Sequence, residues 1–587
     1  MTLENHTTQD SSNLPPVLHI GQRIEQATFR GTVRYIGPIA STEGEWAGIE
    51  WDEAVRGKHS GEHGDHKYFT CLFPGTGSFT RISKKITTGT EFLSEVKDRY
   101  VGDEQSLAKT KAQEDGMYLE GSNIKIELFD FERVREKQRN LSELTSISLN
   151  GSLLARAGDP EEARKALPKV EDLDVSSTLI SSWSTVSQIC GALPKLEILR
   201  VNRNRFVPLT ETPMFGNAFQ NVRVLTLNRI YMSWSELTLL EPSLPNLEVL
   251  QFGYNQLKTL NMSEDDDNTQ DGVDNGQQQH QPLRKLAPTQ FAKLKDLHLE
   301  GNGMQDWREI QRLSALPSLV SLDLSENAFE AIEGSDNGDG EYFSRLEVLR
   351  LPDNPLREWR SVDQLAAGYP ALKTLWLTTP ECIPKQVVTV EDLGPGSTQA
   401  QASALTKSLD AGSRTNIVAR CPNLTMLNGN EITAKERMSS ELYYLNYVGM
   451  ATVGVDKELM KRYHPRYEAL CEIHGAPDTS EETRKAQSEM LKDRLMTLKI
   501  AVRETEGGAT KMTLERKLLE TMTVRSLKNL VQKLAKLPAL RQEICFWVPS
   551  PIKEGQMVKV VLADDLRMLS YYDVKDGQEM IAYDKTK

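Results

Sequence analysis

The sequence predicts a multidomain chain in which a long α/β solenoid follows a small all-β domain and precedes a compact α/β domain. Three observations predict this architecture. An apolar pattern recurs about every 26 residues in the middle of the chain, glycines and aromatic residues gather near its start, and a strand–strand–helix–strand pattern lies near its end. A chain of 587 residues is long enough for about four ordinary domains, and a solenoid takes the place of two or three of them.

Each repeat contains a nine-residue block with apolar residues at positions 1, 4 and 6 and Asn at position 9. Complete copies begin at Leu196 (LEILRVNRN), Leu247 (LEVLQFGYN), Leu294 (LKDLHLEGN), Leu319 (LVSLDLSEN) and Leu346 (LEVLRLPDN). Copies without the Asn begin at Leu144, Val170, Val222 and Leu372, and a truncated copy begins at Leu424. A period between about 20 and 29 residues with this pattern is that of leucine-rich repeats, whose short strands stack into one parallel sheet.

Two further features of the repeats indicate structural roles. Proline recurs two residues before the leading position, at Pro168, Pro194, Pro245, Pro317 and Pro370. Proline lacks an N–H and disfavours helix in the residue before it. Each proline is therefore expected to end the segment on the outer side of its repeat, so that the next strand can begin. We expect the Asn at position 9 to point into the turn and to bond with backbone groups there.

Side chains at positions 3, 5 and 7 of each block are expected to point away from the core, into the concave face, because side chains alternate along a strand. Position 3 carries Ile198, Val224 and Val249 in three consecutive blocks, flanked by Asp172 and Asp296. Position 5 carries Arg200, Arg350 and Trp376. An apolar strip beside arginines predicts a protein-binding surface, and the alternative is that a flanking helix or loop covers it.

The segment from residue 21 to residue 81 is rich in glycine and aromatic side chains. Short alternating runs such as TVRYI and AGIEW are separated by glycine-containing turns, which predicts a small antiparallel β-barrel. The aromatic residues of the segment are Tyr35, Trp46, Trp51, Tyr68, Phe69 and Phe79.

Two motifs in this segment resemble those of the CAP-Gly domain, an SH3-like barrel. The family's G-x-W-x-G-x-E element is matched by Gly44, Trp46, Gly48 and Glu50. Its Gly-Lys-Asn-Asp-Gly signature is matched by Gly57, Lys58, His59, Ser60 and Gly61, with His59 and Ser60 as departures. The resemblance implies recognition of acidic C-terminal tails that end in an aromatic residue, as on tubulin. The candidate tail-binding residues are Trp46, Trp51, Gly57, Lys58, His59, Ser60, Gly61, Phe69 and Phe79.

The chemistry of these residues fits such a tail. Lys58 can meet a carboxylate, glycines allow backbone N–H groups to approach it, and aromatic faces can hold a terminal ring. His59, with an ordinary pKa near 6.5, would gain charge on acidification and strengthen its hold on an acidic tail. The alternative is that Lys58 is a solvated loop lysine.

The closing segment resembles a ubiquitin-like β-grasp domain. Strand-like runs MTLKIAVR, KMTLERKLL, EICFWV and MIAYD surround a helix with apolar residues at Val524, Leu527, Leu530, Val531 and Leu534. The chain ends in DKTK rather than Gly-Gly, so we do not expect this domain to be conjugated to other proteins.

These patterns divide the chain into five parts. We expect a CAP-Gly domain at 17–88, a linker and N-terminal cap at 89–143, leucine-rich repeats at 144–440, a helical cap and hinge at 441–493 with the hinge at 478–493, and the ubiquitin-like domain at 494–587. The part at 89–143 contains a helix EFLSEVKDRY, a strand-like IKIELFDF and a charged helix. Insertions near 261–285 and 382–420 interrupt the repeats, and both are expected to be surface loops.

Composition excludes several classes of function. The net charge is −13 without a sustained block of Lys or Arg, so nucleic acid is not expected to be the main partner. No apolar run approaches the ~18 residues of a membrane span, and the polar first residues do not resemble a signal sequence. The six cysteines lie far apart, which argues against a disulfide framework or a zinc site. We expect a soluble protein of the cytoplasm, bound to no membrane.

The order of CAP-Gly domain, leucine-rich repeats and ubiquitin-like domain resembles the tubulin-folding cofactors. That resemblance implies a chaperone, associated with the cytoskeleton, that holds α-tubulin. It also implies that this chaperone assembles tubulin dimers together with cofactor C and with cofactor D, which carries β-tubulin. With cofactor B, it would take dimers apart. Motifs of nucleotide-binding enzymes, zinc proteases and serine hydrolases are absent, so we expect neither catalysis nor a cofactor. A ubiquitin-system adaptor and a microtubule-binding scaffold remain as alternatives.

Overall fold

The computed structural model describes the chain in two compact units, Met1–Tyr444 with Gly454–Leu470, and Leu445–Val453 with Cys471–Lys587. The residues described are 16–101, 140–260, 287, 289–334, 343–377, 387–409, 413–478, 495–519, 522–549, 557–565, 567–572 and 574–586. Each unit is described by itself below.

The predicted N-terminal barrel is confirmed. Its main antiparallel sheet has the order β1 (Arg23–Gln26), β2 (Phe29–Gly37), β3 (Trp46–Trp51), β6 (Gly77–Arg81). A short hairpin of β4 (Glu62–His63) and β5 (His66–Lys67) and a 3-10 turn η2 (Ala54–Arg56) lie between β3 and β6. Alternate residues of β3 fill the core, because Ala47, Ile49 and Trp51 are all at most 1% exposed.

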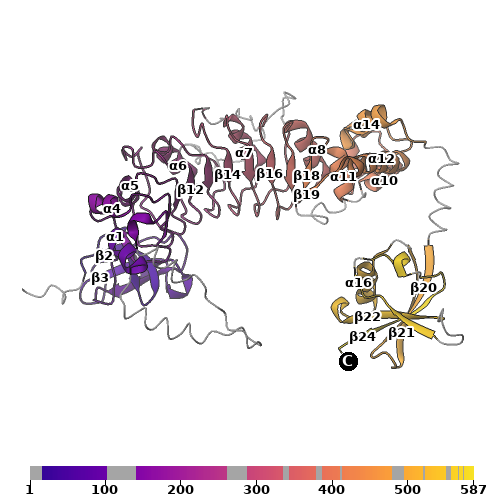
Figure 1. Ribbon diagram of the computed structural model, residues 1–587, viewed down its shortest axis with the longest axis horizontal. Helices are drawn as coiled ribbons and strands as arrows, with labels where there is room; N and C mark the ends of the chain where they lie inside the picture. Colours follow the sequence, from indigo (N-terminus) through magenta and orange to yellow (C-terminus); the bar gives the residue numbers. More distant parts are fainter. Residues whose placement is uncertain are drawn as a thin grey trace, which may run out of the picture. The chain divides into compact units, whose positions relative to one another are not determined.

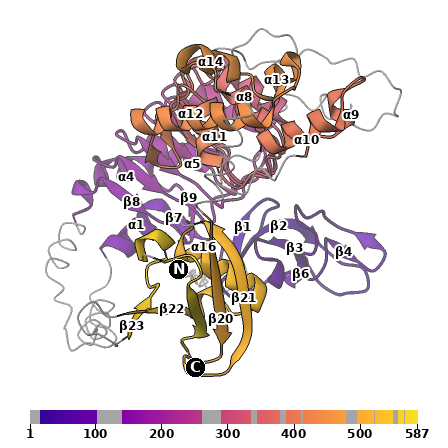
Figure 2. The same cartoon turned by 90° about the vertical axis from the view of Figure 1, so that its right-hand side faces the viewer.

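A helix covers the first edge of the solenoid. Strand β7 (Thr90–Glu91) pairs in parallel with β9 (Leu154–Arg156), and α1 (Phe92–Tyr100) follows directly (Figure 2). The helix buries Phe92, Leu93 and Val96 in the solenoid core, so the predicted helix EFLSEVKDRY acts as an N-terminal cap. The strand-like IKIELFDF and the charged helix predicted after it lie outside the described residues.

The predicted repeats form one sheet of eleven strands (Figure 1). Its order follows the chain, from β8 (Ser146–Ser148) through β10 (Asp172–Asp174), β11 (Ile198–Arg200), β12 (Val224–Thr226), β13 (Val249–Gln251), β14 (Asp296–His298), β15 (Ser321–Asp323), β16 (Val348–Arg350), β17 (Thr374–Trp376) and β18 (Met426–Leu427) to β19 (Asn430–Glu431). Neighbouring strands are parallel except for the last pair, in which β19 turns back on β18. The residue at position 4 of each block, Ile147 in the first and Leu in the others, lies in the core, as the alternation predicts.

Short helices form the outer layer of the solenoid. They are α4 (Pro160–Ala166), α5 (Trp183–Gly191), α6 (Trp234–Leu240), α7 (Trp307–Arg312) and α8 (Trp359–Gly368), with 3-10 turns η3 (Leu141–Glu143), η4 (Glu241–Ser243) and η6 (Leu313–Ala315). Four of these helices begin with a buried tryptophan, and side chains such as Ser182 and Ser233 cap their first turns. The tryptophans therefore anchor the outer layer to the core.

The asparagines at position 9 bond with the turns, as predicted. Asn204 accepts a hydrogen bond from the Thr178 backbone N–H at 2.8 Å and donates to the carbonyls of Val175 and Val201 at 2.9 and 3.0 Å. Asn255, Asn302, Asn327 and Asn354 are buried and bonded in the same manner. Each asparagine thus ties one repeat to its neighbour.

The expectation of a surface loop near 382–420 is wrong for its described part. The chain forms α9 (Val390–Leu393), α10 (Gln399–Ser408) and α11 (Ser413–Arg420) there. Thr398 caps α10, and Ala402 and Leu405, three residues apart on one helical face, are fully buried in the solenoid core. The insertion near 261–285 lies outside the described residues.

The solenoid ends in α12 (Ala434–Ala451), α13 (Lys457–Tyr463) and α14 (Tyr467–His474). A buried ion pair joins α11 to α8, because Arg420 donates to both oxygens of Asp363 at 2.7 and 2.6 Å. His464 bonds with Arg420, Tyr444 and Ser408, and its burial lowers its pKa well below the ordinary value. All but the first residue of the predicted hinge at 478–493 lie outside the described residues.

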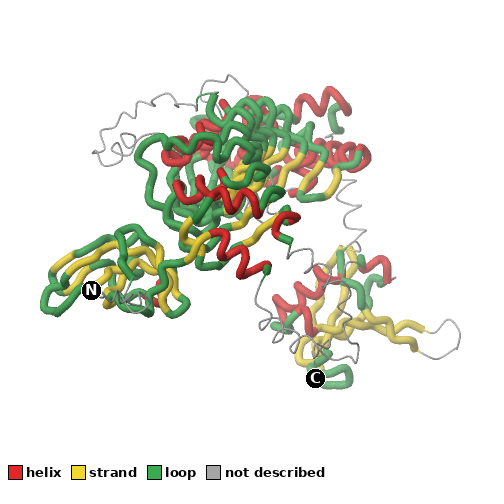
Figure 3. The backbone as a smooth tube through the Cα atoms, turned by 60° about the vertical axis from the view of Figure 1, so that its left-hand side comes forward, coloured by secondary structure: helices red, strands yellow, loops and turns green. Residues whose placement is uncertain are grey.

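The C-terminal domain is a β-grasp (Figure 3). Its sheet has the order β21 (Thr510–Leu519), β20 (Leu495–Arg503), β24 (Glu579–Asp584), β22 (Gln542–Pro549), β23 (Met557–Val561), and short turns η7 (Ala539–Arg541) and η8 (Leu569–Tyr572) complete it. Among the described strands of this sheet, β20 and β24 pair in parallel and the other neighbours are antiparallel. Helix α16 (Val524–Ala535) buries Val524, Leu527 and Val531, three of the apolar residues predicted to face the sheet.

Candidate functional site

The glycine loop at 57–61 runs beside strand β6 of the barrel. The backbone N–H groups of Lys58 and His59 both donate to the Gly77 carbonyl, at 2.7 and 3.1 Å, and the Gly77 N–H donates to the His59 carbonyl at 2.7 Å. These bonds hold the loop to the sheet while the Lys58 side chain remains exposed.

Two glycines of this loop are required by close backbone contacts. A Cβ atom at Gly57 would lie 2.0 Å from the Gly75 carbonyl oxygen. A Cβ atom at Gly61 would lie 2.0 Å from the Phe69 carbonyl oxygen, and Gly61 has a φ of +107°. No other residue type fits either position without moving the backbone.

His59 and Ser60, the two departures from the CAP-Gly signature, both support the loop from within. The His59 Nδ1 accepts a hydrogen bond from the Gly61 N–H at 3.0 Å, and the Ser60 Oγ accepts one from the Gly75 N–H at 2.9 Å. Burial is the largest cause that lowers the pKa of His59 below 6.5, and the charges of His63 and Lys58 lower it further. The expectation of an ordinary pKa for His59 is therefore wrong.

An aromatic cluster lies beside the loop, with Phe79 at its centre. The ring centroid of Phe79 is 4.8 Å from that of His59, 5.5 Å from Phe69, 5.4 Å from Tyr68 and 6.3 Å from Tyr35. Phe69 is 8% exposed and forms the base, whereas the Phe79 and Tyr68 side chains are half-buried. The pairs of Phe79 with Phe69, Tyr68 and Tyr35 are edge-to-face and the pair with His59 is tilted, and edge-to-face pairs at these distances are favourable.

The G-x-W-x-G-x-E element positions this cluster from β3. A Cβ atom at Gly48 would lie 2.5 Å from Cε1 of Phe69, so glycine makes room for the base of the cluster. Glu50 is buried, accepts a hydrogen bond from the Leu72 N–H at 2.5 Å and pairs with Arg34 at 2.8 Å. Glu50 thereby fixes the segment 71–76, which carries Gly75.

Tyr35 and Tyr68 belong to the cluster, although neither was among the predicted binding residues. Alternation along β2 would place Tyr35 on the same face as the core residue Val33. The pairing of β2 with β3 shifts register between Val33 and Tyr35, as at a β-bulge, and such a shift re-aims the following side chain. No local pattern in the sequence signals that shift.

The prediction that Trp51 contacts a ligand is contradicted by the structure. Trp51 is 1% exposed, and its indole N–H donates to the Ser78 Oγ at 2.6 Å. Trp46, at the other end of β3, is half-buried, and the Arg81 guanidinium lies 4.9 Å from its ring centroid. The two tryptophans are five positions apart on one strand and so face opposite sides, which the alternation alone could have indicated.

The concave strip of the solenoid is continuous. Ile198, Val224 and Val249 lie opposite one another in the parallel register, and all three are half-buried. Arg200 forms an ion pair with Asp172, and Arg350 donates to the Ser321 Oγ at 3.3 Å.

Trp376 is half-buried near the far end, with its ring 3.0 Å from the position that a Cβ atom of Gly429 would take. The candidate residues of this face therefore fall into three groups: one apolar strip, two arginines with polar partners, and Trp376, which stands apart from both.

A charged group adjoins the strip. His298 lies between Asp296, at 3.3 Å, and Asp323, at 3.8 Å, and the hydrogen bond to Asp296 is the largest cause that raises its pKa. Within the part of the chain that the structure describes, no group of three or more His, Cys, Asp or Glu side chains could hold a metal ion. None of the described helices is both long and apolar enough to cross a membrane.

Comparisons with known proteins agree with this architecture. A model of the CAP-Gly domain family matches residues 20–85. The Bos taurus protein named tubulin-specific chaperone E is 31% identical over 571 residues, which cover 95% of this chain and 97% of that protein. The Homo sapiens protein of the same name is 30% identical with the same coverage. The Arabidopsis thaliana protein named tubulin-folding cofactor E is 26% identical over 575 residues, 96% of this chain and 97% of that protein.

Among solved structures, the solution structure of the C-terminal ubiquitin-like domain of mouse tubulin-specific chaperone e is similar to the end of this chain. It is 26% identical, covers 16% of this chain and 87% of that one, and has a TM-score of 0.13. Because this score is low, the description of the C-terminal domain rests on its own strands and helix.

Proposed function

The chain belongs to the tubulin-specific chaperone E family, and from that premise we propose that it is a tubulin-folding chaperone whose N-terminal barrel binds the acidic C-terminal tail of α-tubulin. The observation that carries the proposal is the exposed Lys58 on a rigid glycine loop, next to the aromatic cluster around Phe79. A cation beside ring surfaces is the pairing that a tail ending in an aromatic residue with a free carboxylate requires.

Each part of the site has a separate task in this proposal. The Lys58 ammonium group donates to the terminal carboxylate, and the half-buried rings of Phe79, Tyr68 and Tyr35 receive the terminal aromatic side chain. Phe69, beneath them, provides the floor and excludes water from the contact. Gly57 and Gly61 keep the loop close to β6, so that the cation and the rings are held at a fixed separation.

The solenoid supplies a second contact in the proposal. The strip of Ile198, Val224 and Val249 on the concave sheet holds the folded body of α-tubulin, while the barrel holds its tail. The chaperone then works in the cytoplasm with cofactor D carrying β-tubulin and with cofactor C to assemble dimers, and with cofactor B to take them apart. Support for this wider role comes from the family alone.

Titration of a fluorescent α-tubulin tail peptide with the full chain tests tail recognition. Lys58→Ala removes one charge-assisted hydrogen bond, worth about 1.5 to 3 kcal/mol, so the dissociation constant rises by roughly ten- to a hundredfold. Lys85→Ala is the matched control, because Lys85 is an exposed lysine of the same barrel that lies outside the glycine loop. Equal affinity of parent and Lys58→Ala would contradict the proposal.

The same protein separates the alternative functions. Stoichiometric capture of α-tubulin from a lysate supports the chaperone, whereas capture of ubiquitin machinery without tubulin supports a ubiquitin-system adaptor. Co-sedimentation with microtubules, without binding to soluble tubulin dimers, would indicate a scaffold for the polymer instead.

A further inference from the structure

The barrel is joined to the solenoid by a very short connection. Thr87 is still bonded to the barrel, since its N–H and carbonyl exchange hydrogen bonds with Glu25 at 2.8 and 2.9 Å. The Thr90 N–H already donates to the Leu153 carbonyl of the first repeat, at 2.9 Å. Only Thr88 and Gly89 lie between these anchor points, and two residues span about 7 Å at most.

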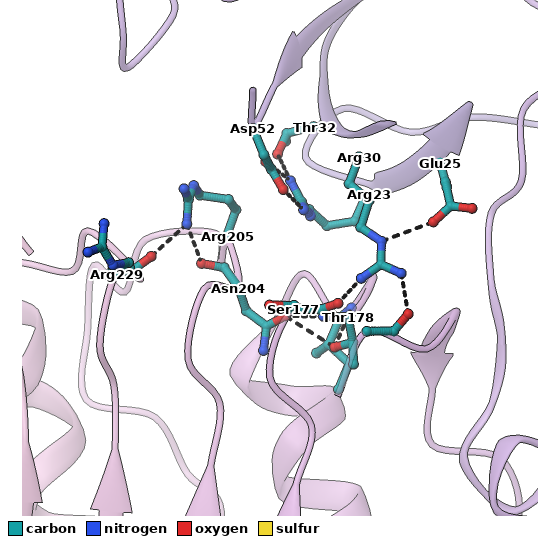
Figure 4. A network of polar contacts seen from close by, with 12 residues as sticks. Arg23, Glu25, Arg30, Thr32, Asp52, Ser177, Thr178, Asn204, Arg205 and Arg229 are labelled. Atoms are coloured by element: carbon teal, nitrogen blue, oxygen red, sulfur yellow. Dashed lines mark hydrogen bonds and ion pairs between the residues drawn. The ribbon is translucent and has the colours of Figure 1, made fainter. Parts of the chain in front are cut away.

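Arg30 of β2 binds the first turns of the solenoid directly (Figure 4). Its guanidinium donates to the Ser177 carbonyl and, at 2.5 Å, to the Gly151 carbonyl, while its Nε is held by Glu25 at 3.0 Å. Ser177 and Gly151 occupy position 8 in consecutive repeats, where positive φ angles of 52° and 77° turn their carbonyls outward. One side chain of the barrel thus donates hydrogen bonds to backbone carbonyls in two turns of the solenoid.

A second contact joins the next turns to the glycine-loop side of the barrel. The ring centroid of Phe73 lies 4.8 Å from that of Tyr231, edge to face, and the Arg205 guanidinium lies 4.3 Å from the Tyr231 ring. Burial lowers the pKa of Arg205, and the negative charge of Asp52 on the barrel is the largest opposing cause. Nearby, a Cβ atom at Gly21 would lie 3.2 Å from Val207.

Phe73 belongs to the segment that supports the tail site. Its carbonyl accepts the Thr76 hydroxyl at 2.6 Å. Two residues further on, the Gly75 N–H bonds with Ser60, and the Gly75 carbonyl packs against Gly57. A contact on Phe73 therefore acts on the segment against which the glycine loop rests.

We propose that the barrel and the first four repeats form one rigid body, and that the Tyr231–Phe73 contact holds the glycine loop in its binding conformation. Tyr231 is a positioning residue in this account, because it reaches a bound tail only through Phe73. The position of a tail bound by the loop would then be fixed relative to the first four repeats, as it would not be if the barrel were flexibly linked to the solenoid.

The test uses the full chain with two matched tyrosine variants. Tyr231→Asn removes the ring that faces the barrel, and Asn tolerates the φ of +59° at this position. Tyr254→Asn is the control, because Tyr254 has a φ of +58° and an arginine, Arg229, at 4.5 Å from its ring. Its hydroxyl bonds with Glu326 of the solenoid at 2.9 Å, so this variant removes a tyrosine ring from a positive-φ position of the solenoid without touching the barrel contact.

The rate of hydrogen exchange at the backbone amides of Gly75 and Thr76 measures, without any ligand, whether the Tyr231–Phe73 contact stabilises this segment of the barrel. We expect faster exchange in Tyr231→Asn and the parent's rate in Tyr254→Asn. Affinity for the tail peptide, which rests on the proposed function, should fall about threefold to tenfold in Tyr231→Asn alone, the scale of one aromatic pair. If the parent fails to bind the peptide, the exchange rates still decide whether the barrel is docked.

A double-mutant cycle distinguishes positioning from a general loss of structure. In a Phe73→Ala background, Tyr231→Asn should have no further effect on exchange or affinity, because its route to the loop is already gone. Unchanged exchange in Tyr231→Asn, or equal changes in both tyrosine variants, would overturn the docking. Faster exchange with unchanged peptide affinity would overturn the link to the glycine loop.

Discussion

Replacing Gly61 with Ala gives a sharp test of the tail site, because one methyl group is placed against the backbone. The new Cβ atom would lie 2.0 Å from the Phe69 carbonyl oxygen, and the φ of +107° lies outside the region that L residues populate. A relaxed contact needs more than about 3 Å, so the loop must move by about 1 Å. In addition, left-handed backbone alone costs a non-glycine residue about 1 to 2 kcal/mol.

Displacement of the loop separates Lys58 from the aromatic cluster, and we expect tail-peptide affinity to fall by about a hundredfold. Gly64→Ala is the control, since Gly64 also has a positive φ, +59°, but no residue beyond its two chain neighbours would lie within 4 Å of the new Cβ atom. That variant should lose about 1 kcal/mol of stability and keep its affinity. Fluorescence anisotropy with labelled peptide measures the affinity of both variants. Equal affinities of Gly61→Ala and Gly64→Ala would refute the requirement for glycine at position 61.

Two further predictions concern the solenoid and the pH dependence of the loop. Val224→Arg places an uncompensated charge in the centre of the concave strip. Burying this charge under a bound partner typically costs several kcal/mol, so capture of tubulin should be lost. The melting temperature should change little, because the side chain lies on the surface of the free protein. Val320→Arg, at an exposed position 2 of another block, is its control, and a large fall in the melting temperature of Val224→Arg alone would contradict the assignment of Val224 to the surface. For His59, the lowered pKa means that the folded loop favours the neutral ring, so its stabilising contribution is present above pH 6.5 and is lost as the pH falls through the lowered value. A protonated ring cannot accept the hydrogen bond from the Gly61 N–H that supports the loop, so peptide affinity should fall between pH 7.5 and pH 5.5. The fall should be smaller in His59→Asn, which keeps an acceptor for that N–H, and the same fall in both proteins would refute the role of His59.

The parts of the fold that depend on local periodicity could be predicted from the sequence. The leucines at position 4 and the asparagines at position 9 recur because every repeat faces the same core and closes the same turn. Helix α16 was predictable for a similar reason, since Val524, Leu527 and Val531 follow the helical period.

Features set by contacts distant in the sequence could not be predicted. Tyr35 joins the aromatic cluster through a register shift between two strands, which no local pattern signals. The helices at 390–420 interrupt the repeat period, which made their segment resemble a loop. The bond from Arg30 to Ser177 joins residues 147 positions apart, and no pattern in either segment indicates it.

Recognition of a terminal aromatic residue by the barrel is the central claim, and trimmed tubulin tests it most directly. Binding of the full chain is measured with soluble tubulin whose α-chain tail is intact and with tubulin from which the terminal aromatic residue has been removed. Because the rings around Phe79 and the Lys58 ammonium act on that one residue, its removal should weaken binding by at least about tenfold. Lys58→Ala should weaken the binding of intact tubulin and leave a smaller difference between the two tubulins, because the rings still receive the terminal aromatic side chain. Equal binding of intact and trimmed tubulin by the parent protein would contradict the account.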